Sequence, residues 1–235
     1  MKINIAIFYN FFFSVILFVL IILIILIPIP LYGWFFINLL GFIGLVLPLY
    51  SWSLEHKRFE EKYGKEKGEK ITQIFGVISS IFFFTFWIGI WISPQPIFII
   101  PIFQKIYLII PIINLKIYLI HIIFSLPLII IGSWIPFKAL KSMSAKVAET
   151  HKPERIIDDG VYSYLRHPQY LGGILAHIGI SILFSALYSF IITPLIILII
   201  YIEIKKEEKE LIKEFEGEYE NYKKHVSMFI PFKKK

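Results

Sequence analysis

Long uncharged apolar runs alternate along this chain with short segments rich in lysine and glutamate. The runs extend from Ile7 to Pro28, from Trp34 to Leu54, from Ile71 to Ile92 and from Ile117 to Phe137. A helix needs roughly 20 apolar residues to cross a hydrocarbon core of about 30 Å. All four runs reach that length, so we predict that each forms a membrane-spanning helix.

The last apolar stretch, from Leu171 to Ile202, is too long for one span. Its middle contains Ser185 and Ser189, and Pro194 follows. We therefore predict a tight hairpin of two spans, which gives six spans in total. Five is the alternative, if this pair is a re-entrant or strongly tilted element. The segment from Pro96 to Leu115 is also apolar, but its prolines and a lysine favour an interfacial loop.

The composition supports the same class of protein. Apolar residues make up 57% of the chain, and the mean hydropathy is +0.73. Soluble domains are nearer half apolar and lack such long uncharged runs. The first run is too long for a signal-peptide core, and no cleavage site follows it, so we expect a retained span. The chain has no cysteine, which excludes disulfides and Cys-ligated metals, and we predict no metal site.

Basic residues are concentrated in residues 55–70, 138–166 and 203–235, which hold 21 of the 24 lysines and arginines. Such residues accumulate in the cytosolic loops of membrane proteins. With six spans, these segments and the N-terminus share one side, which we expect to be the cytosol. The lysines can attract anionic headgroups. They alternate with glutamate rather than with aromatic residues, so we expect no nucleic-acid partner.

No repeat or low-complexity linker divides the chain. We therefore expect one integral membrane domain over residues 1–235, with the N-terminal spans in residues 1–137 and most of the polar chemistry in residues 138–235. The predicted fold class is all-α. It is a polytopic transmembrane helical bundle that ends in a helical hairpin and a cytosolic amphipathic C-terminal helix.

One polar patch precedes the hairpin, between Tyr162 and Gly173. Arg166 and His167 stand directly before Pro168, a residue that favours the first turn of a helix. The N-terminus of that helix offers free N–H groups to an anion. Snorkelling to headgroups is the alternative for the arginine. His177 lies two turns into the span, where it is either an interhelical hydrogen-bond partner or a functional group.

A second polar patch follows the hairpin, from Glu203 to Leu211. Glu203 and Glu207 share a helix face at i, i+4. An apolar stripe continues beyond them through Phe215, Tyr219, Tyr222 and Val226. A solvated helix with Glu–Lys pairs is the alternative interpretation. The hairpin, however, would return this patch to the membrane depth of the first one, so we expect the two patches to form one site.

These motifs resemble those of the isoprenylcysteine carboxyl methyltransferase and phospholipid methyltransferase superfamily. The shared pattern is G-x-Y, R-H-P-x-Y-x-G, a helical hairpin, then E-E-x-x-L and F-G-x-x-Y-x-x-Y. Here the pattern extends from Gly160 to Tyr222, with the departure that Glu216 stands between Phe215 and Gly217. The resemblance implies an integral membrane methyltransferase, and it makes residues 138–235 the catalytic region.

The resemblance also implies S-adenosyl-L-methionine as cofactor, bound without a Rossmann domain. No Gly-rich dinucleotide fingerprint follows a plausible strand in this chain. By resemblance, the cofactor would lie in a cytosolic pocket over the hairpin, and the partners would be the membrane and a lipid-like or prenylated substrate. The residues implied to bind the cofactor are Glu154, Arg155, Ile156, Ile157, Tyr162, His167, Pro168, Gln169, Tyr170 and Glu207.

Arg166, His167 and Glu203 are the predicted catalytic residues. Carboxylates and aromatic faces favour a sulfonium cation, and His or Arg can hold the methionine carboxylate. The isoprenylcysteine enzymes have an Arg for the substrate carboxylate at the position of Glu203. A carboxylate there would repel that substrate, although Arg155 or Arg166 could supply the cation. An amine or thiol acceptor would need a base, such as Glu203 or His177.

Two other functions stay open. Membrane sterol and steroid reductases share a related hairpin but bind NADPH, whose 2′-phosphate usually requires more arginine than the three in this chain. The Glu207-Glu208 pair favours the methyltransferase. A transporter or scaffold would carry charged residues inside several spans, where only His121 and His177 are candidates. We interpret His121 as structural.

Overall fold

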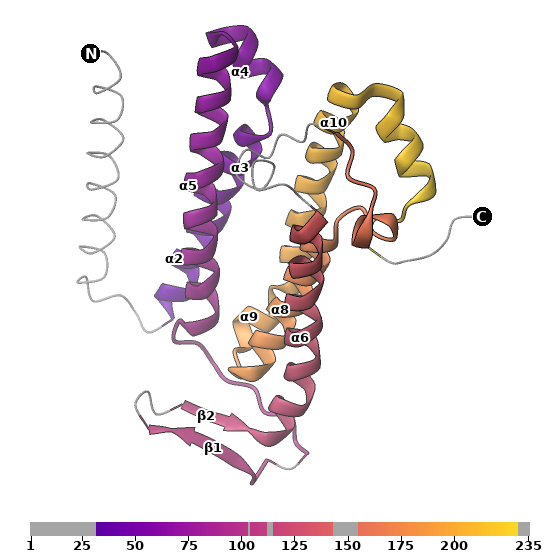
Figure 1. Cartoon of the computed structure of the whole chain (residues 1–235). Helices are drawn as coiled ribbons and strands as arrows, with labels where there is room; N and C mark the ends of the chain where they lie inside the picture. Colours follow the sequence, from indigo (N-terminus) through magenta and orange to yellow (C-terminus); the bar gives the residue numbers. More distant parts are fainter. Residues whose placement is uncertain (1–31, 103, 112–114, 143–154, 230–235) are drawn as a thin grey trace.

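The computed structural model describes residues 32–102, 104–111, 115–142 and 155–229, and these residues are mostly helical (Figure 1). The predicted span from Ile7 to Pro28 and the predicted cofactor residue Glu154 lie outside the described residues. Among the described residues, three helices are long and apolar enough to cross a membrane, and a fourth apolar helix is shorter. The chain is therefore a multi-pass integral membrane protein, while the count of five or six spans stays a prediction.

The first described span is one apolar rod of 21 residues from Gly33 to Ser53. It consists of α2 (Gly33–Gly41), a π-helical turn η1 (Phe42–Val46) and α3 (Leu47–Ser53). The short polar helix α4 (His56–Tyr63) follows, and α5 (Lys65–Ile92) runs back. The reversal between them uses Gly64, whose φ of 82° favours glycine.

The second half of the chain begins with α6 (Leu119–Ser142). The predicted hairpin is present as α8 (Pro168–Leu183), the short helix α9 (Leu187–Ile191) and α10 (Thr193–His225). Pro168 and Pro194 both lie in the first turn of a helix, where a missing N–H costs no hydrogen bond. The turn between α8 and α9 contains Ser185 at a φ of 57°.

The expectation of an all-α fold is wrong at one place. The segment predicted to be an interfacial loop contains the short strand β1 (Tyr107–Ile110). It pairs antiparallel with β2 (Leu115–Tyr118), which begins at the end of that loop and takes up the start of the next predicted span, with Tyr107 opposite Tyr118. These segments are rich in β-branched and aromatic residues, which favour strands. Pairing also satisfies backbone groups in a stretch with few polar side chains.

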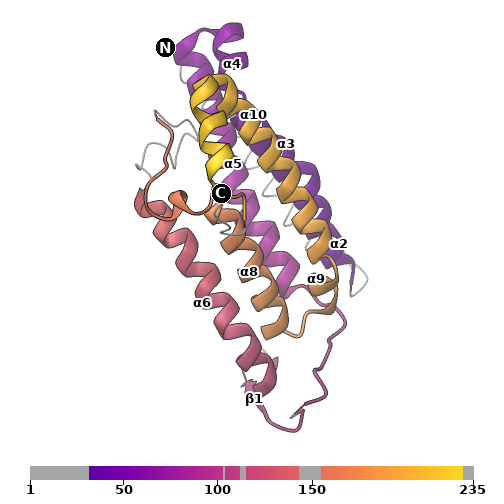
Figure 2. The ribbon, with the colours of Figure 1, turned by 90° about the vertical axis from the view of Figure 1, so that its right-hand side faces the viewer.

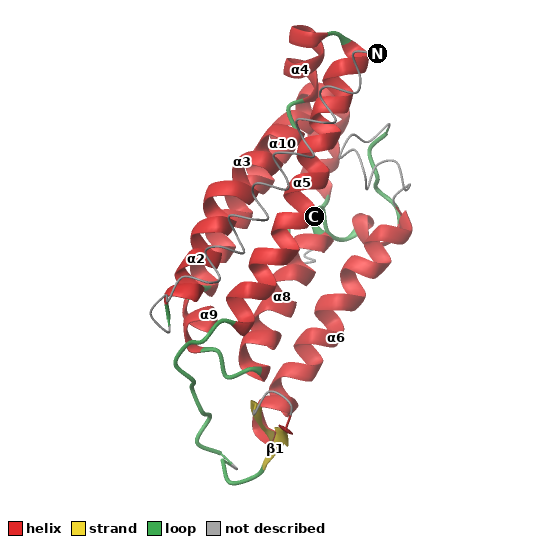
Figure 3. Cartoon of the chain, turned by 90° about the vertical axis from the view of Figure 1, so that its left-hand side faces the viewer, coloured by secondary structure: helices red, strands yellow, loops and turns green. Residues whose placement is uncertain are grey.

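The helices form two groups, with α2, α3 and α5 in one and α6, α8 and α10 in the other (Figures 1 and 2). Helix α4 lies at the opposite end of the bundle from the two strands (Figure 3). A buried cluster from both groups joins them, and it consists of Phe35, Phe42, Val46, Phe86, Trp87, Ile90, Ile174, Ile196, Ile199, Ile200 and Ile204. We call the end of the bundle with α4 and the last part of α10 the basic end.

Two buried histidines link segments inside the bundle. The indole N–H groups of Trp87 and Trp91 both donate to Nδ1 of His177, at 2.9 and 3.0 Å. Nε2 of His177 lies 3.1 Å from the Ser189 carbonyl, to which it donates in the tautomer that this network requires. Both nitrogens of His177 are thus occupied, which leaves it no role as a base. His121 is likewise bonded, to Ser185 and to the backbone N–H of Ile100.

Helices α6 and α8 approach closely where glycines replace larger residues. A Cβ added to Gly172 would lie 2.4 Å from Pro136 and 2.6 Å from the Gly132 carbonyl oxygen. Close backbone approach through small residues is the usual way in which helices pack in a membrane.

We predict that Gly172→Ala destabilises the protein. The methyl group has to displace helix α6, and overpacking of this kind costs about 1–3 kcal/mol. The measurement is the midpoint of thermal unfolding in detergent, followed by tryptophan fluorescence. Gly44→Ala is the control, because a Cβ on Gly44 meets nothing within 4 Å. Equal midpoints for the two variants would contradict the close contact between α6 and α8.

Candidate active site

A cavity of about 580 Å³ lies between the two groups of helices and extends to the basic end. Its inner part is lined by apolar and aromatic side chains, which include Phe42, Val46, Leu47, Phe83, Trp87, Trp91, Ile199 and Ile200. Polar groups line its other end, among them Arg155, Tyr162, His167, Tyr170, Glu203, Glu207, Tyr219 and Tyr222. The cavity thus joins an apolar compartment inside the bundle to a polar one near its end.

The segment before α8 is held by the end of the chain. The backbone N–H of Arg166 donates to the Ser227 carbonyl at 2.9 Å, and that of His167 faces the Met228 carbonyl at 3.4 Å. A turn of 3-10 helix, η3 (Gly160–Ser163), precedes these residues. The backbone of the R-H-P motif is therefore fixed by contacts with residues that lie about sixty positions later in the sequence.

A buried ion cluster surrounds Glu208, a residue only 1% exposed. Its Oε1 lies 3.0 Å from Nε of Arg166 and 3.3 Å from Nε2 of His167, and its Oε2 lies 2.8 Å from Nζ of Lys223. Burial by itself raises the pKa of Glu208. The hydrogen bonds from His167 and Lys223 and the charge of Arg166 outweigh burial and hold the pKa at about 2. Glu208 is therefore ionised throughout the neutral range.

Arg166 belongs to this cluster. Besides Glu208, its guanidinium donates to the carbonyls of Lys223 and Val226, both at 2.8 Å. The R-H-P motif predicts a catalytic role for Arg166. The structure places its charge against a buried carboxylate and two carbonyls, which suits a residue that holds the site in position.

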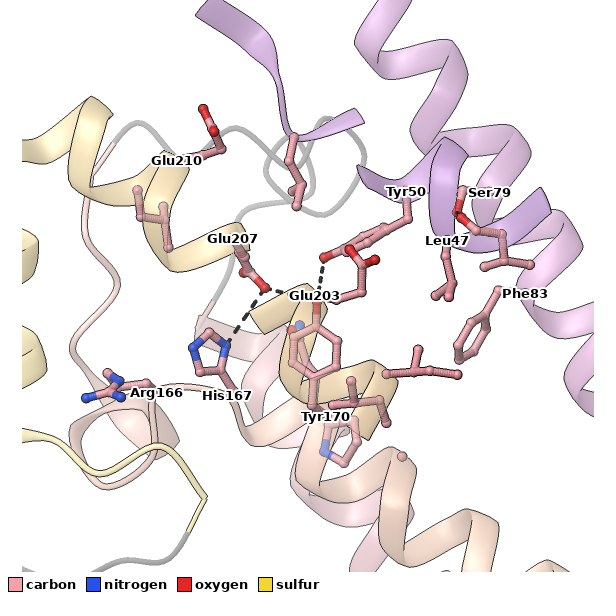
Figure 4. Close-up of a pocket in the computed structure, with 18 of the residues that line it drawn as sticks. Leu47, Tyr50, Ser79, Phe83, Arg166, His167, Tyr170, Glu203, Glu207 and Glu210 are labelled. Atoms are coloured by element: carbon pink, nitrogen blue, oxygen red, sulfur yellow. Dashed lines mark hydrogen bonds and ion pairs between the residues drawn. The ribbon is translucent and has the colours of Figure 1, made fainter. Parts of the chain in front are cut away.

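Glu207, the residue directly before Glu208 on α10, faces the cavity (Figure 4). Its Oε2 accepts a hydrogen bond from the Tyr170 hydroxyl at 2.9 Å and lies 3.8 Å from Nδ1 of His167. The Tyr50 hydroxyl lies 2.6 Å from that of Tyr170. Because the Tyr170 hydroxyl donates to Glu207, it accepts the hydrogen bond that it forms with Tyr50, and the Tyr50 hydroxyl is the donor. The chain of bonds runs from α3 through α8 to α10 and crosses between the two groups of helices.

Glu203 lines the same cavity one helical turn before Glu207 and is 9% exposed. Figure 4 shows it beside Tyr50 and Tyr170. Its Oε2 has no hydrogen-bond partner among the residues that the structure describes. The nearby Lys206 is bound to Glu55 at 2.7 Å and to the Ser51 hydroxyl.

The helix that carries these carboxylates changes direction after them. Glu216 has a φ of 39°, and it interrupts α10 so that the following segment returns toward the R-H-P motif. Tyr222 there donates to the Tyr162 carbonyl at 2.7 Å. Burial is the main cause of raised pKa values at Tyr162, Tyr219 and Tyr222, so these phenols stay neutral. Glu216, where this chain departs from the F-G motif, thus coincides with the bend that precedes the two tyrosines on the cavity wall.

The structure brings most of the predicted site residues together. Those on the cavity wall are Arg155, Ile156, Ile157, Tyr162, Arg166, His167, Gln169, Tyr170, Glu203 and Glu207. Pro168 is buried at the start of α8 and is not among the lining residues. Sequence reasoning missed Tyr50, which stands in an apolar run without any distinguishing pattern, and Lys223, one of several lysines near the end of the chain.

The arrangement suits a positively charged ligand near Glu207. A carboxylate and several tyrosine rings face the same space, and both attract a cation or sulfonium. The apolar compartment beside it suits a hydrocarbon chain. The fold and site together define a helical membrane protein whose cavity joins an apolar compartment to polar groups near the end of its bundle.

Comparison with known proteins agrees with this description. Residues 120–218 match the phospholipid methyltransferase family. Protein-S-isoprenylcysteine O-methyltransferase of Schizosaccharomyces pombe is 30% identical over 126 residues, which cover 48% of this chain and 53% of that protein. The enzyme of the same name from Saccharomyces cerevisiae is 38% identical over 78 residues, 33% of each chain. Methanethiol S-methyltransferase 1 of Bradyrhizobium diazoefficiens is 33% identical over 88 residues, 37% of this chain and 30% of that protein.

These matches confirm the resemblance on which the family prediction rests. Residues 120–218 are similar to the phospholipid methyltransferase family, and the similarity to membrane methyltransferases is found in the half of the chain that holds the candidate site. The chain spans about half the length of the fission-yeast relative and about a third of the other two. No solved structure matches it significantly.

We predict that Glu208→Gln destabilises the basic end. The substitution leaves the buried Arg166 without its counter-ion, which costs about 3–5 kcal/mol. The measurement is the free energy of unfolding in detergent, with the exposed Glu220→Gln on the same helix as control.

The difference between wild type and Glu208→Gln should also depend on pH. A carboxylate with a lowered pKa stabilises the fold above its ordinary value of 4.5 and loses that effect as the pH falls to about 2. The difference should therefore be complete at neutral pH and should disappear between about 4.5 and 2. A difference that stays constant across this range would show that Glu208 acts by shape and not by charge.

Proposed function

We propose that this protein transfers a methyl group from S-adenosyl-L-methionine to a lipid-like or prenylated-cysteine-like substrate at the cytosolic face of a membrane. One observation carries the proposal. The R-H-P and E-E patches meet at the polar end of a cavity whose other end is apolar and lies within the bundle. A hydrophobic substrate and a charged methyl donor thus have adjoining places.

The polar end has the chemistry that this cofactor requires. Glu207 and the rings of Tyr162, Tyr170 and Tyr219 supply an anion and aromatic faces for a sulfonium. Arg155, whose side chain is 66% exposed and lies 3.6 Å from Asp159, is at the rim, and we infer that it pairs with the methionine carboxylate. When bound, S-adenosyl-L-methionine supplies a methyl group on a sulfur that is already an activated leaving group.

Given such a donor, the main tasks of the protein are alignment and exclusion of water. The Tyr50–Tyr170–Glu207 chain of hydrogen bonds holds Glu207 in one orientation. His167 is fixed between Glu207 and Glu208. The apolar compartment keeps the acceptor group away from bulk water. These contacts support a preformed site in which little rearrangement is needed before methyl transfer.

Lateral access suits a substrate that is itself dissolved in the bilayer. The cavity lining includes Phe84 and Ile88 of α5 and Leu140 of α6, and these side chains are 46–63% exposed on the outside of the bundle. We infer that the hydrocarbon chain enters between these two helices. The basic segments around α4 and α10 favour the cytosolic side for the polar end.

We predict that Glu207→Ala and His167→Ala abolish cofactor binding while the protein stays inserted in the membrane. Glu207 supplies the carboxylate for the sulfonium, and His167 lies against both glutamates of the pair. Binding is measured by equilibrium dialysis of purified protein with radiolabelled S-adenosyl-L-methionine. Glu220→Ala, at an exposed position of the same helix, is the control and should bind as wild type does. Unchanged affinity in both site variants would overturn the cofactor assignment.

A further inference from the structure

The end of the bundle opposite the basic end carries a small sheet with uncovered apolar side chains. All four residues of β1 are exposed, from 38% at Ile110 to 63% at Leu108. Successive residues of a strand point to opposite faces of the sheet. Tyr107 and Ile109 therefore lie on one face, and Leu108 and Ile110 lie on the other. The hairpin of β1 and β2 thus exposes apolar side chains on both of its faces.

This hairpin is joined directly to a membrane span. Strand β2 ends at Tyr118, and α6 begins at the next residue. The backbone N–H of Leu119 donates to the Ile106 carbonyl at 3.0 Å, and the buried Tyr118 ring packs on His121 of α6. The strands lie across the direction of the helices (Figure 1). Because α6 is long and apolar enough to cross a membrane, the hairpin lies where that span ends, along the membrane surface.

Two lysines give the hairpin its charge. Lys105 directly precedes β1 and Lys116 belongs to β2, and both are exposed. Nζ of Lys116 lies 5.1 Å from the centre of the Tyr107 ring. No acidic residue stands between Glu69 and Glu149, so this stretch of the chain brings no carboxylate to the lysines. Tyrosine is enriched at the boundary between hydrocarbon and water, and lysine there extends its ammonium group toward the headgroups.

We propose that the hairpin is inserted into the headgroup layer of the bilayer at this end of the bundle. Leu108, Ile109 and Ile110 lie among the upper parts of the acyl chains, and Lys105 and Lys116 bind phospholipid phosphates. The outer edge of each strand has unpaired backbone groups, which need water. The hairpin therefore lies in the hydrated headgroup layer and not in the hydrocarbon core. This anchoring does not depend on the chemistry in the cavity.

A bilayer fits the hairpin better than a protein partner does. A second copy of the chain, or another protein, that packed on one face would leave the apolar side chains of the other face in water. The headgroup layer surrounds both faces at once. It also supplies anions for the two lysines, and it is continuous with the lipid around α6.

The test measures the surroundings of each face separately. The chain has no cysteine, so one introduced cysteine can carry an NBD fluorophore at a single known position. Leu108→Cys and Ile109→Cys label the two faces. Full-length protein is placed in nanodiscs of phosphatidylcholine and phosphatidylglycerol, whose acyl chains carry bromine either near the headgroup or near the chain end. Glu61→Cys, exposed on α4, is the control for water, and Ile130→Cys, exposed within α6, is the control for the hydrocarbon core.

We expect bromine near the headgroup to quench both hairpin labels at least about threefold more than the Glu61→Cys label. Elements that lie in the interface are buried by about 5–10 Å, which brings their side chains to the upper acyl chains. Bromine near the chain end should instead act most strongly on Ile130→Cys. Quenching of the hairpin labels by aqueous iodide alone would overturn the proposal. Protection of either label from both quenchers would also overturn it, and would indicate a docked second copy or another protein.

The role of the lysines is tested in the Ile109→Cys protein. Lys105→Glu together with Lys116→Glu should lower the quenching at residue 109 at least about twofold, because anionic headgroups repel the new carboxylates. The same pair of changes in the Ile130→Cys protein should leave its quenching unchanged, which shows that the span stays inserted. Equal quenching at residue 109 with and without the two changes would refute the binding of phosphates by these lysines.

Discussion

A carboxylate inside a protein is stable only where cations and hydrogen-bond donors replace its lost water. Glu208 meets that condition because Arg166, His167 and Lys223 converge on it. These residues come from the segment before α8 and from the end of α10, so the ion cluster fixes the two ends of the hairpin against each other. Arg166 also binds the carbonyls of the returning segment. The tyrosines on that segment reach the cavity wall only because the segment is held there.

The glutamates of α10 face two different surroundings, a buried ion cluster and the cavity. Successive helix positions differ by about 100° in direction, whereas positions four apart share a face. Glu208 therefore faces the ion cluster, while Glu207 and Glu203 both face the cavity. Glu207 is held by Tyr170, and Glu203 has an oxygen without a protein partner among the described residues. The E-E motif thus contains one residue whose charge is bound within the fold and one that faces the cavity.

The hydrophobic runs predicted the described spans well, because a helix that crosses a bilayer requires a long run of uncharged apolar residues. They placed the start of α5 too late, since the polar residues from Lys65 are helical without being apolar. The convergence of the two polar patches was also predictable from the hairpin. The carbonyl partners of Arg166, on Lys223 and Val226, were not, because they lie beyond the bend at Glu216 and about sixty positions from Arg166. Tyr50 lies in an apolar run, where nothing local distinguishes a tyrosine that faces a cavity.

The cavity itself follows from the way helices associate in lipid. Between apolar helices in a bilayer there is little hydrophobic driving force, so contact depends on close packing and on hydrogen bonds. Glycines on α6 and α8 permit close packing between these two helices. The face of α5 carries Phe83, Trp87 and Trp91 instead, and the cavity lies beside these bulky side chains. The two tryptophans bind His177 of α8 by hydrogen bonds, which hold the two groups of helices together across that space. The bundle can therefore contain an apolar compartment while its helices stay in place.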